Sequence, residues 1–314
     1  MKTVIPFVAQ THERDRQTWI AALGAAMPQC EIKEFAALSA QERAAARVAI
    51  VADPDPSDLA GMPNLAWVHS LWAGVERIVG ELPMDGPTIV RLEDPQMAAT
   101  MAEAVLAWTL YLHRDMPRYR SQQAEKIWRE HELPLPSERT IGLLGMGALG
   151  RVAAAKLLQQ SFRVCGWSRS GTDVEGVETF AGETELDRVL GLSDIVVVLM
   201  PLTAQTRGLV NAKRLSAMKQ GASLINFARG PIVDTAALVE HLDRGHLDHA
   251  VLDVFDEEPL PAHSPLWNHP QVTVLPHISG PTNRTTASAI VAGNIRTYLQ
   301  SGRIPPGVDR ARGY

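Results

Sequence analysis

Three side chains with acid–base or anion-binding chemistry each follow a short apolar run in the second half of the chain. They are Arg229, Glu258 and His277. A histidine can give a proton to a carbonyl oxygen, a carboxylate beside it raises its pKa, and a guanidinium binds a carboxylate through a planar fork of donors. Singly, each has an ordinary explanation, as a satisfied structural histidine, a solvated glutamate or a surface ion-pair partner. Together they predict one catalytic site.

The apolar runs before these side chains are expected to be parallel strands. The segments that follow the runs are Asn226–Gly230, Asp253–Leu260 and Pro276–Gly280. In an open α/β sheet, ligands bind in the crevice outside the carboxyl ends of the strands. We therefore expect the three segments to project toward the same crevice.

A glycine-rich loop, Gly145-Met146-Gly147-Ala148-Leu149-Gly150, is the second candidate site. It ends an apolar run and opens a predicted helix, Arg151–Gln160, which is the context of a dinucleotide-binding fingerprint. The first glycine permits the turn, the second lets the backbone approach a pyrophosphate, and the third lets helix and strand pack closely. A plain strand–helix turn and a methyltransferase loop share this pattern, so the loop alone leaves both alternatives open.

The residues after the next apolar run, Ser168-Arg169-Ser170, bear on the choice of cofactor. An NAD site usually has Asp or Glu about 20 residues after the loop, bonded to the ribose 2′-hydroxyl. Here no acid appears until Asp173. A guanidinium suits a 2′-phosphate, although an exposed arginine with no role is the alternative. The sequence predicts that NADP(H) is preferred and that NAD(H) is possible.

Short apolar runs alternate with longer amphipathic segments along almost the whole chain. Runs that are apolar on both faces suit buried parallel strands, and the segments between them suit crossover helices. The sequence therefore predicts an α/β fold with parallel sheets. The runs are Val4–Ala9, Arg47–Ala52, Leu65–Ser70, Thr88–Leu92, Thr140–Gly145, Arg163–Trp167, Asp194–Met200, Ala222–Phe227, His249–Val254 and Gln271–Leu275.

A long helix is predicted over Pro95–Arg118, between the two sets of runs, because apolar side chains recur there on one helical face. A domain boundary is expected near residue 100, with this helix crossing it. The last predicted helix, Ala287–Leu299, must return to one domain or the other, and the sequence does not say which.

Length and composition bound the class of protein. The chain has 314 residues, which favours two domains, and 46% of them are hydrophobic, enough to build a core. The formal net charge is −5 and the basic residues are scattered, so a nucleic-acid partner is not expected. No apolar run is long enough to cross a membrane. Cys30 and Cys165 show no disulfide or metal spacing, which favours a reducing, cytoplasmic location.

Several other residues are of types that could bind a metal, a substrate or a cofactor. His241, His246 and His249 lie among polar residues with no matching carboxylates, so solvated side chains are expected and no metal is predicted. Arg284 could add a second cationic contact to substrate or cofactor, but an exposed position at the start of a helix is the favoured interpretation. The tryptophans that bear on a pocket are Trp67, Trp72 and Trp267, which suit either the core or the pocket lining.

A set of motifs along the chain resembles the D-isomer-specific 2-hydroxyacid dehydrogenases. The motifs are LWAG (Leu71–Gly74), RLEDPQMAATMAEAVL (Arg91–Leu106), GMGALG, FARG, EEPLP, SPLWNHP (Ser264–Pro270), PHISG and the terminal Arg312-Gly313-Tyr314. Within the family, the segment from Arg91 and the tail half are most similar to the glyoxylate/hydroxypyruvate reductases of the bacterial A type. The resemblance covers nearly the whole chain.

The resemblance implies a role for each matching residue. His277 would be the general acid, Glu258 would hold its ring and favour the imidazolium, and Arg229 would clasp the substrate carboxylate. The backbone N–H groups of Ala73 and Gly74, beside Trp72, would complete the carboxylate site. Asp253 would contact the nicotinamide carboxamide. The further cofactor-binding residues implied are Gly145, Met146, Gly147, Ala148, Leu149, Gly150, Ser168, Arg169, Ser170, Pro201, Ser279 and Gly280.

The resemblance also implies the architecture. We expect two Rossmann-like domains, with the cofactor domain inserted into the substrate domain. The flavodoxin-like substrate-binding domain would comprise residues 1–100 plus 288–314, and the NAD(P)-binding Rossmann domain residues 101–287. A homodimer through the long helix is implied as well.

The activity implied is NADPH-dependent reduction of a small 2-keto acid, glyoxylate or hydroxypyruvate, to the D-2-hydroxy acid. Relatives of the A type usually have a small residue where Trp72 stands, and a bulky ring there would shrink or reshape the pocket. Reduction of a bulkier 2-keto acid by an enzyme of the same family is an alternative. Formate dehydrogenases carry Gln in place of Glu258, so that activity is disfavoured. Phosphite dehydrogenase shares Arg229, Glu258 and His277, but the Ser168-Arg169-Ser170 turn and the C-terminal segments argue against it. A non-catalytic NAD(P)-sensing corepressor or scaffold is the alternative from another class.

Overall fold

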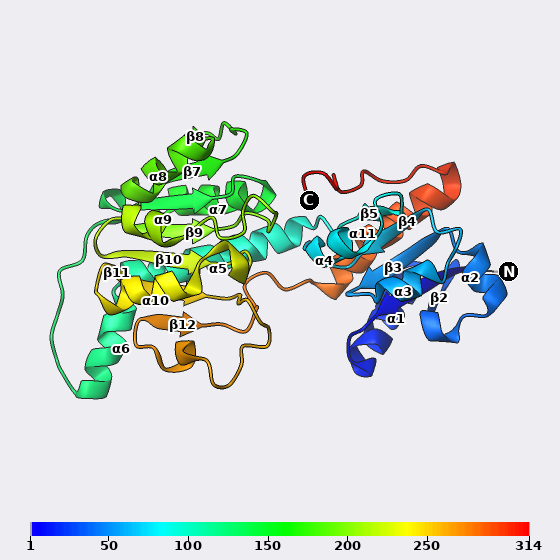
Figure 1. Cartoon of the computed structure of the whole chain (residues 1–314), viewed down its shortest axis with the longest axis horizontal. Coiled ribbons are helices and arrows are strands. Elements are labelled where there is room, and N and C mark those ends of the chain that lie inside the picture. The colour runs from blue at the N-terminus through cyan, green and yellow to red at the C-terminus, as the bar shows by residue number, and fades with distance from the viewer. Residues whose placement is uncertain (1, 314) are drawn as a thin grey trace. The chain divides into compact units, whose positions relative to one another are not determined.

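The computed structural model describes residues 2–313, which form two compact units (Figure 1). Unit 1 comprises Met1–Met97 with Thr282–Tyr314, and unit 2 comprises Ala98–Pro281. The chain therefore leaves unit 1 and returns to it, whereas the sequence placed the two divisions after residues 100 and 287. Within residues 2–313, no helix is both long and apolar enough to cross a membrane.

Unit 1 is built on a five-stranded parallel sheet of order β2-β1-β3-β4-β5. Its central strands are buried on both faces, which fits strands covered by helices on both sides. The strands are β1 (Thr3–Ala9), β2 (Cys30–Glu34), β3 (Val48–Ala52), β4 (Trp67–Ser70) and β5 (Thr88–Val90).

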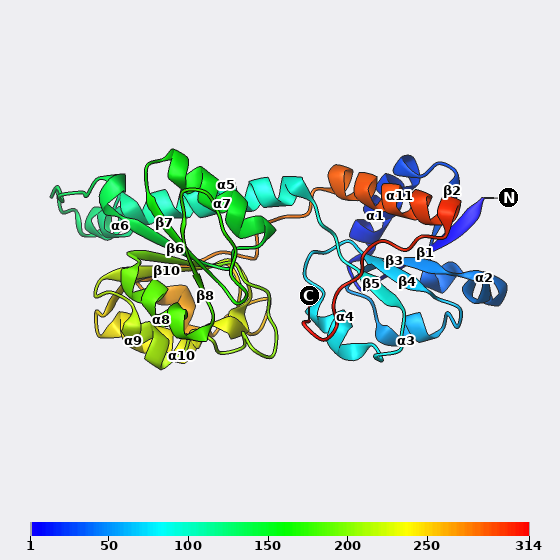
Figure 2. The same ribbon diagram turned by 90° about the horizontal axis from the view of Figure 1, so that it is seen from above.

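The helices of unit 1 cover the two faces of that sheet (Figure 2). One face packs Phe7, Ile50 and Trp67 against helices α1 and α11, and the other packs Val51 and neighbouring side chains against α3 and α4. The helices are α1 (Glu13–Ala26), α2 (Ala40–Ala45), α3 (Pro56–Ala60), α4 (Glu76–Glu81) and α11 (Arg284–Ser301), with a 3-10 turn at Phe35–Ala37. The last predicted helix thus returns to unit 1, where it contacts α1.

Unit 2 holds a seven-stranded parallel sheet of order β12-β11-β10-β9-β6-β7-β8. The inner strands are buried along their whole length. The strands are β6 (Thr140–Leu144), β7 (Arg163–Ser168), β8 (Glu178–Ala181), β9 (Ile195–Val198), β10 (Ala222–Asn226), β11 (Leu247–Leu252) and β12 (Val272–Val274).

Helices also cover both faces of the sheet in unit 2. On one face the cluster around Val196 and Leu224 includes side chains of α8, α9 and α10, and on the other the cluster around Val197 and Ile225 includes side chains of α5 and α7. The helices are α5 (Pro95–His113), α6 (Met116–Glu125), α7 (Ala148–Gln159), α8 (Glu183–Leu192), α9 (Ala212–Ala217) and α10 (Thr235–Asp243), with 3-10 turns at Pro136–Glu138, Gly230–Ile232 and Pro265–Asn268.

The α/β class and the two parallel sheets confirm the predicted fold class. Each predicted apolar run overlaps a strand. The sequence missed β2 and β8, which lie at sheet edges and include polar, partly exposed residues. An edge strand that is solvated on one side does not form a continuous apolar run.

The single long helix predicted over Pro95–Arg118 is wrong at its C-terminal end. Helix α5 ends at His113, and Asp115 adopts a left-handed backbone conformation before α6 begins at Met116. The break has a local cause, because in a continuous helix Pro117 could donate no N–H to the carbonyl of His113, four residues earlier, and its ring would clash with that carbonyl. Proline is instead accommodated in the first turn of α6.

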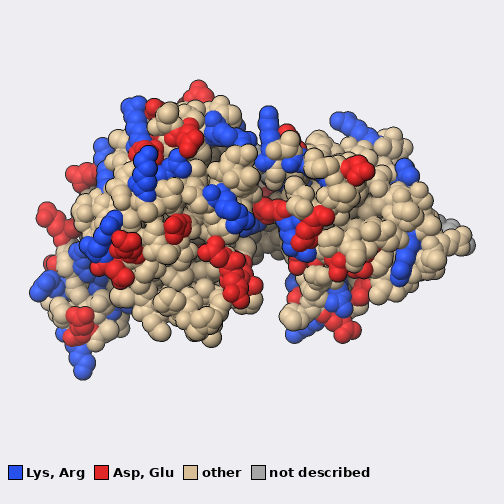
Figure 3. All heavy atoms as spheres, in the orientation of Figure 1, with Lys and Arg blue, Asp and Glu red and all other residues tan. Residues whose placement is uncertain are grey.

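Charged side chains of both signs are interspersed over the face shown in Figure 3. Many are paired locally, as Arg214 is with Glu183 and Asp187. Exposed pairs of this kind stabilise a fold by only about 0–1 kcal/mol each. We therefore ascribe the stability of both units mainly to their apolar clusters.

Candidate active site

The carboxyl ends of the parallel strands in unit 2 gather the predicted site residues at one edge of the sheet. The sheet order reverses between β6 and β9, so the topological switch point lies there. The glycine loop follows β6, Pro201 follows β9, and Arg229, Asp253 and His277 follow β10, β11 and β12. The topology thus brings to one edge the residues that the sequence placed after successive runs.

His277 and Glu258 form a close pair at this edge. Nδ1 of His277 lies 2.7 Å from Oε2 of Glu258, and the other carboxylate oxygen accepts the N–H of Phe255 at 2.9 Å. The hydrogen bond that the ring of His277 donates to the Glu258 carboxylate raises the pKa of His277, against the opposing effect of burial. Burial raises the pKa of Glu258, but the hydrogen bonds from His277 and Phe255 outweigh it and hold that pKa below its usual value. The pair therefore favours the imidazolium–carboxylate form.

Asp253 fixes the loop that carries His277. Its buried carboxylate accepts the N–H of Ile278 at 2.7 Å and that of Ser279 at 2.9 Å, and its carbonyl accepts the N–H of His277 at 3.0 Å. These bonds hold His277 in a left-handed backbone conformation, with φ of 52°. Non-glycine residues in that region are uncommon and concentrate at functional sites.

Arg229 lies on a turn that Asn226 organises. The side chain of Asn226 accepts the N–H of Ala228 at 3.1 Å and donates to the carbonyl of Arg229 at 3.0 Å. Gly230 is required by packing, because a Cβ there would lie 2.1 Å from the carbonyl carbon of Phe255. The Arg229 turn and the segment that carries Glu258 are thereby pressed together.

The glycine loop has the packing that the fingerprint requires. Gly145 has a φ of +117°, and a Cβ at Gly150 would lie 2.0 Å from the carbonyl oxygen of Gly145. Gly147 differs, because a Cβ there would meet nothing within 4 Å, and this residue caps α7 without any side-chain hydrogen bond. The first turn of α7 therefore presents its backbone N–H groups beside open space, which suits an anion.

Two buried hydroxyls at the carboxyl edge of the unit 2 sheet have no partner among residues 2–313. They are Oγ of Ser168, at the end of β7, and Oγ of Ser279, in the loop after β12. A buried hydroxyl without a hydrogen bond is costly, so these atoms suit a polar ligand. Arg169 and Ser170 follow Ser168 and are exposed. The residues at this edge therefore fit a dinucleotide.

The predicted carboxylate loop, Leu71–Gly74, follows β4 in unit 1. Leu71 is buried, whereas Trp72, Ala73 and Gly74 are partly exposed. Oγ of Ser70 accepts the N–H of Trp72 at 3.0 Å, and the carbonyl of Trp72 accepts the N–H of Leu92 at 3.1 Å. The loop is therefore anchored at both sides of Trp72.

The three candidate tryptophans and Arg284 differ in their surroundings. Trp67 is fully buried in the core of unit 1, and Trp267 is half exposed, with its Nε1 bonded to the carbonyl of Pro261. The ring of Trp72 meets that of Trp19 edge to face, with centroids 6.0 Å apart. Arg284 begins α11, lies over Trp19 and pairs with an aspartate of α1.

The prediction that His241, His246 and His249 are solvated is wrong for two of them. His241 and His249 are buried, and His246 is intermediate. His241 bonds the carbonyl of Ala237, one helical turn earlier, and burial lowers the pKa of His249 to about 4. Their hydrogen bonds make burial tolerable, which polar neighbours in the sequence do not reveal. Among residues 2–313, no group of three His, Cys, Asp or Glu side chains is placed to hold a metal.

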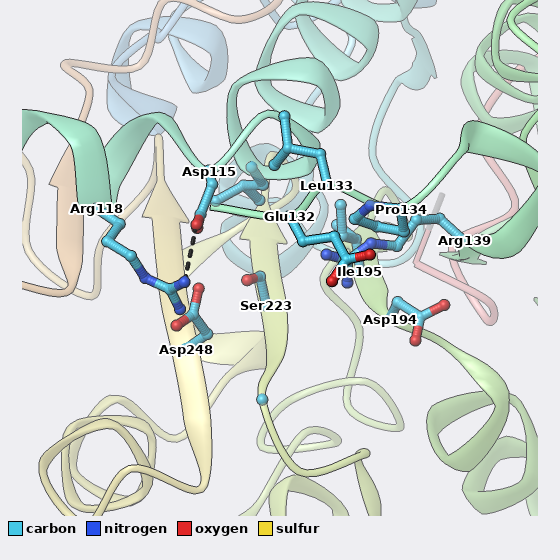
Figure 4. Close-up of a pocket in the computed structure, with 12 residues that line it drawn as sticks. Asp115, Arg118, Glu132, Leu133, Pro134, Arg139, Asp194, Ile195, Ser223 and Asp248 are labelled. Carbon is cyan, nitrogen blue, oxygen red and sulfur yellow. Dashed lines mark ion pairs between the residues drawn. The ribbon is translucent and has the colours of Figure 1, made fainter. Parts of the chain in front are cut away.

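A cavity of about 190 Å³ lies at the opposite edge of the sheet in unit 2 (Figure 4). Asp194, Ser223 and Asp248 line it near the amino ends of β9, β10 and β11, and an Asp115–Arg118 ion pair of 2.9 Å closes one side. It is polar, and burial, followed by the charge of Asp115, raises the pKa of Asp248. Because it lies away from the carboxyl ends of the strands, it is separate from the site of His277.

Sequence reasoning missed the residues that position the site. Asn226 and Ser70 have no chemical role in the expected reaction, yet each holds a turn at a strand end. The available signal was a short polar side chain as the last residue of an apolar strand, where it can bond the backbone of the next turn.

Comparison with known proteins finds a matching family and a relative of nearly the same length. The family described as D-isomer specific 2-hydroxyacid dehydrogenase, NAD binding domain, matches residues 106–279. A glyoxylate/hydroxypyruvate reductase A of Yersinia enterocolitica is 36% identical over 308 residues, which are 96% of this chain and 97% of that protein.

Two solved structures are similar over the whole chain. A D-isomer specific 2-hydroxyacid dehydrogenase of Xanthobacter autotrophicus Py2, in complex with NADPH and MES, is 38% identical with a TM-score of 0.92. An NADPH-dependent glyoxylate/hydroxypyruvate reductase of Sinorhizobium meliloti, in complex with NADP and sulfate, is 32% identical with a TM-score of 0.90. Each comparison covers 100% of both chains.

Proposed function

Because the chain belongs to the D-isomer-specific 2-hydroxyacid dehydrogenases, we propose that it reduces a small 2-keto acid, glyoxylate or hydroxypyruvate, to the D-2-hydroxy acid with NADPH. The observation that carries this proposal is the His277–Glu258 pair, which lies at the same sheet edge as Arg229 and the glycine loop. The relatives of Yersinia enterocolitica and Sinorhizobium meliloti are reductases of these two acids by name.

His277 would protonate the carbonyl oxygen of the keto acid. Since Nδ1 is engaged by Glu258, Nε2 is the ring nitrogen that can donate to substrate. The raised pKa of His277 keeps the acid form populated near neutral pH, as a general acid needs. After the proton is given, the Glu258 carboxylate still holds the ring by the Nδ1 hydrogen bond.

Arg229 would bind the substrate carboxylate and polarise the adjacent keto oxygen. A guanidinium matches a carboxylate with two parallel hydrogen bonds, which fix orientation as well as charge. Backbone N–H groups of Ala73 and Gly74 would bind the same carboxylate from unit 1, the substrate-binding domain. Trp72 would contact the substrate from the same loop, and its bulky ring would shrink or reshape the pocket. Reduction of a bulkier 2-keto acid is the alternative activity.

Unit 2 would hold the cofactor. The residues from Gly145 to Gly150 would bind the pyrophosphate at the start of α7, and Ser168, Arg169 and Ser170 would bind the 2′-phosphoribose. Asp253, Ser279 and Gly280, with Pro201, would surround the nicotinamide. When bound, NADPH supplies the hydride that reduces the carbonyl carbon. The structures of the Xanthobacter and Sinorhizobium relatives contain NADPH and NADP, which supports NADP(H) as the preferred cofactor, with NAD(H) possible.

NADPH oxidation with glyoxylate, hydroxypyruvate, pyruvate and phenylpyruvate tests the proposal, with NADH in parallel. Turnover of glyoxylate and hydroxypyruvate with NADPH is expected, and equal KM values for NADPH and NADH would contradict the role of Arg169. Turnover of phenylpyruvate alone would indicate that the enzyme reduces bulkier 2-keto acids instead. If none of the four acids caused NADPH oxidation while the protein still bound NADPH, a non-catalytic sensor would be favoured.

We also propose a homodimer in the cytoplasm. The segment that follows α6 exposes Ile127, Trp128 and Leu135, and Trp128 is 98% exposed. Apolar side chains gathered on one exposed segment mark a surface that a second chain covers. Cys30 and Cys165 are free and buried, which suits a reducing compartment.

A further inference from the structure

Unit 1 has a ligand-binding edge of its own. In its sheet, the order reverses between β1 and β3, and ligands of such sheets bind at the carboxyl edge beside that switch point. Gln10 follows β1, Asp53 follows β3 and Trp72 follows β4 closely, and the strands are in register, with Ala9 beside Ala52 and Val51 beside Ser70. The N–H of Gln10 bonds the carbonyl of Asp53 at 3.3 Å. Asp53 therefore stands in one row with the carboxylate loop.

The backbone of Asp53 is unusual for its place in the fold. Non-glycine residues with positive φ in the described part of the chain are Asp53, Asp115, Lys126, Ser161 and His277. Three of them follow helices, where a left-handed residue is an ordinary termination. Only Asp53 and His277 follow strands, each at the carboxyl edge of its sheet. Left-handed residues outside such caps concentrate where a side chain must be aimed.

Arg77 fixes the direction of the Asp53 carboxylate. Its Nε and Nη2 lie 2.7 and 2.6 Å from Oδ1 of Asp53, and the same guanidinium bonds the carbonyl of Pro54 and the carboxylate of Glu81. Oδ2 of Asp53 has no hydrogen-bond partner within residues 2–313, and the side chain is 54% exposed. One oxygen is thus held by Arg77, and the other is left to accept a further hydrogen bond.

We propose that Asp53 is a specificity-determining residue of the proposed reaction, on which this inference rests. Its Oδ2 accepts a hydrogen bond from a hydroxyl on carbon 3 of the keto acid, while the neighbouring Trp72–Gly74 loop holds the substrate carboxylate. The site then favours 3-hydroxy-2-keto acids, with hydroxypyruvate the simplest, over acids that lack this hydroxyl. A second carboxylate at the distal end of the substrate would be repelled.

Hydroxypyruvate and pyruvate differ only by that hydroxyl, so the ratio of their kcat/KM values with NADPH tests the proposal. Asp53→Gly suits the positive φ and removes the carboxylate. A hydrogen bond to a charged group is worth about 1.5–3 kcal/mol, so the ratio should fall by about 10- to 150-fold. Asp53→Asn, which also tolerates this backbone and keeps a neutral acceptor, should give a smaller fall.

Asp115→Gly is the matched control, because Asp115 is also left-handed and paired with an arginine, but lies at the opposite edge of the other sheet. It should leave the ratio unchanged. An equal fall of kcat/KM for both acids in Asp53→Gly, or an unchanged ratio, would overturn the inference while leaving the proposed reductase intact. Absence of turnover by the native enzyme with every acid would overturn the proposed function and this inference with it.

Discussion

At the scale of single residues, the chemistry depends on how Glu258 and His277 are joined. The 2.7 Å contact uses one ring nitrogen and leaves the other for substrate, and the carboxylate is itself held by the N–H of Phe255. Asp253 fixes the backbone on the other side of the ring through Ile278 and Ser279. The ring is therefore oriented from two directions before any substrate arrives.

Replacing the acid tests this role. His277→Ala should lower kcat for keto-acid reduction by about 10²–10⁴-fold, because the carbonyl oxygen loses its proton donor. The affinity for NADPH, measured by fluorescence titration, should stay within a few fold, because the pyrophosphate loop is untouched. A variant with full kcat would contradict the role, and the NADPH titration guards against mistaking an unfolded variant for an inactive one.

The pH dependence follows from the raised pKa of His277. Reduction needs the protonated imidazole, so kcat/KM should be level at low pH and should fall as pH rises through that pKa, above the usual value of about 6.5. Glu258→Gln removes the charge that favours the imidazolium, so the fall should begin at lower pH. A fall that stayed in place, or moved to higher pH, in Glu258→Gln would show that another group titrates.

At the scale of elements, two glycines of the glycine loop have different roles, one in packing and the other in the approach of a ligand. A Cβ at Gly150 would meet the carbonyl of Gly145 at 2.0 Å, whereas one at Gly147 would meet nothing within 4 Å. Gly150→Ala should therefore lower the free energy of unfolding by about 1–3 kcal/mol or more. Gly147→Ala should keep the native stability and weaken NADPH binding, because its methyl group occupies the approach of the pyrophosphate. Urea unfolding and NADPH titration of both variants check the pair, and equal destabilisation of the two would contradict this assignment.

The elements also show what the sequence could predict. Strands buried on both faces leave continuous apolar runs, so all the inner strands and their carboxyl-end residues were predictable. Edge strands β2 and β8 do not leave such runs, and the break at Asp115 depends on one proline. The turn made by Asn226 and the burial of His241 and His249 arise from contacts between separate segments, which spacing alone does not encode.

At the scale of the whole molecule, the exposed apolar segment after α6 tests the proposed dimer. Trp128→Asp should shift the protein from dimer to monomer in light scattering, because a carboxylate would be buried without a partner in the interface. Met84→Asp is the matched control, since Met84 is an exposed apolar residue of unit 1 and should leave the dimer intact. A monomeric native protein, or a dimer unaffected by Trp128→Asp, would contradict the assignment of this surface.

The two units divide the proposed work between them. Unit 2 carries the residues that fit a dinucleotide, together with Arg229, Glu258 and His277. Unit 1 carries Asp53 and the loop Leu71–Gly74, which would bind the substrate carboxylate. We propose that the enzyme performs a stereospecific two-electron reduction, and the product itself is the most direct evidence for it. The native enzyme should be incubated with hydroxypyruvate and NADPH, and the glycerate formed should be resolved by chiral chromatography. We predict D-glycerate in a one-to-one ratio with the NADPH consumed; L-glycerate, or NADPH consumption without glycerate, would contradict the account.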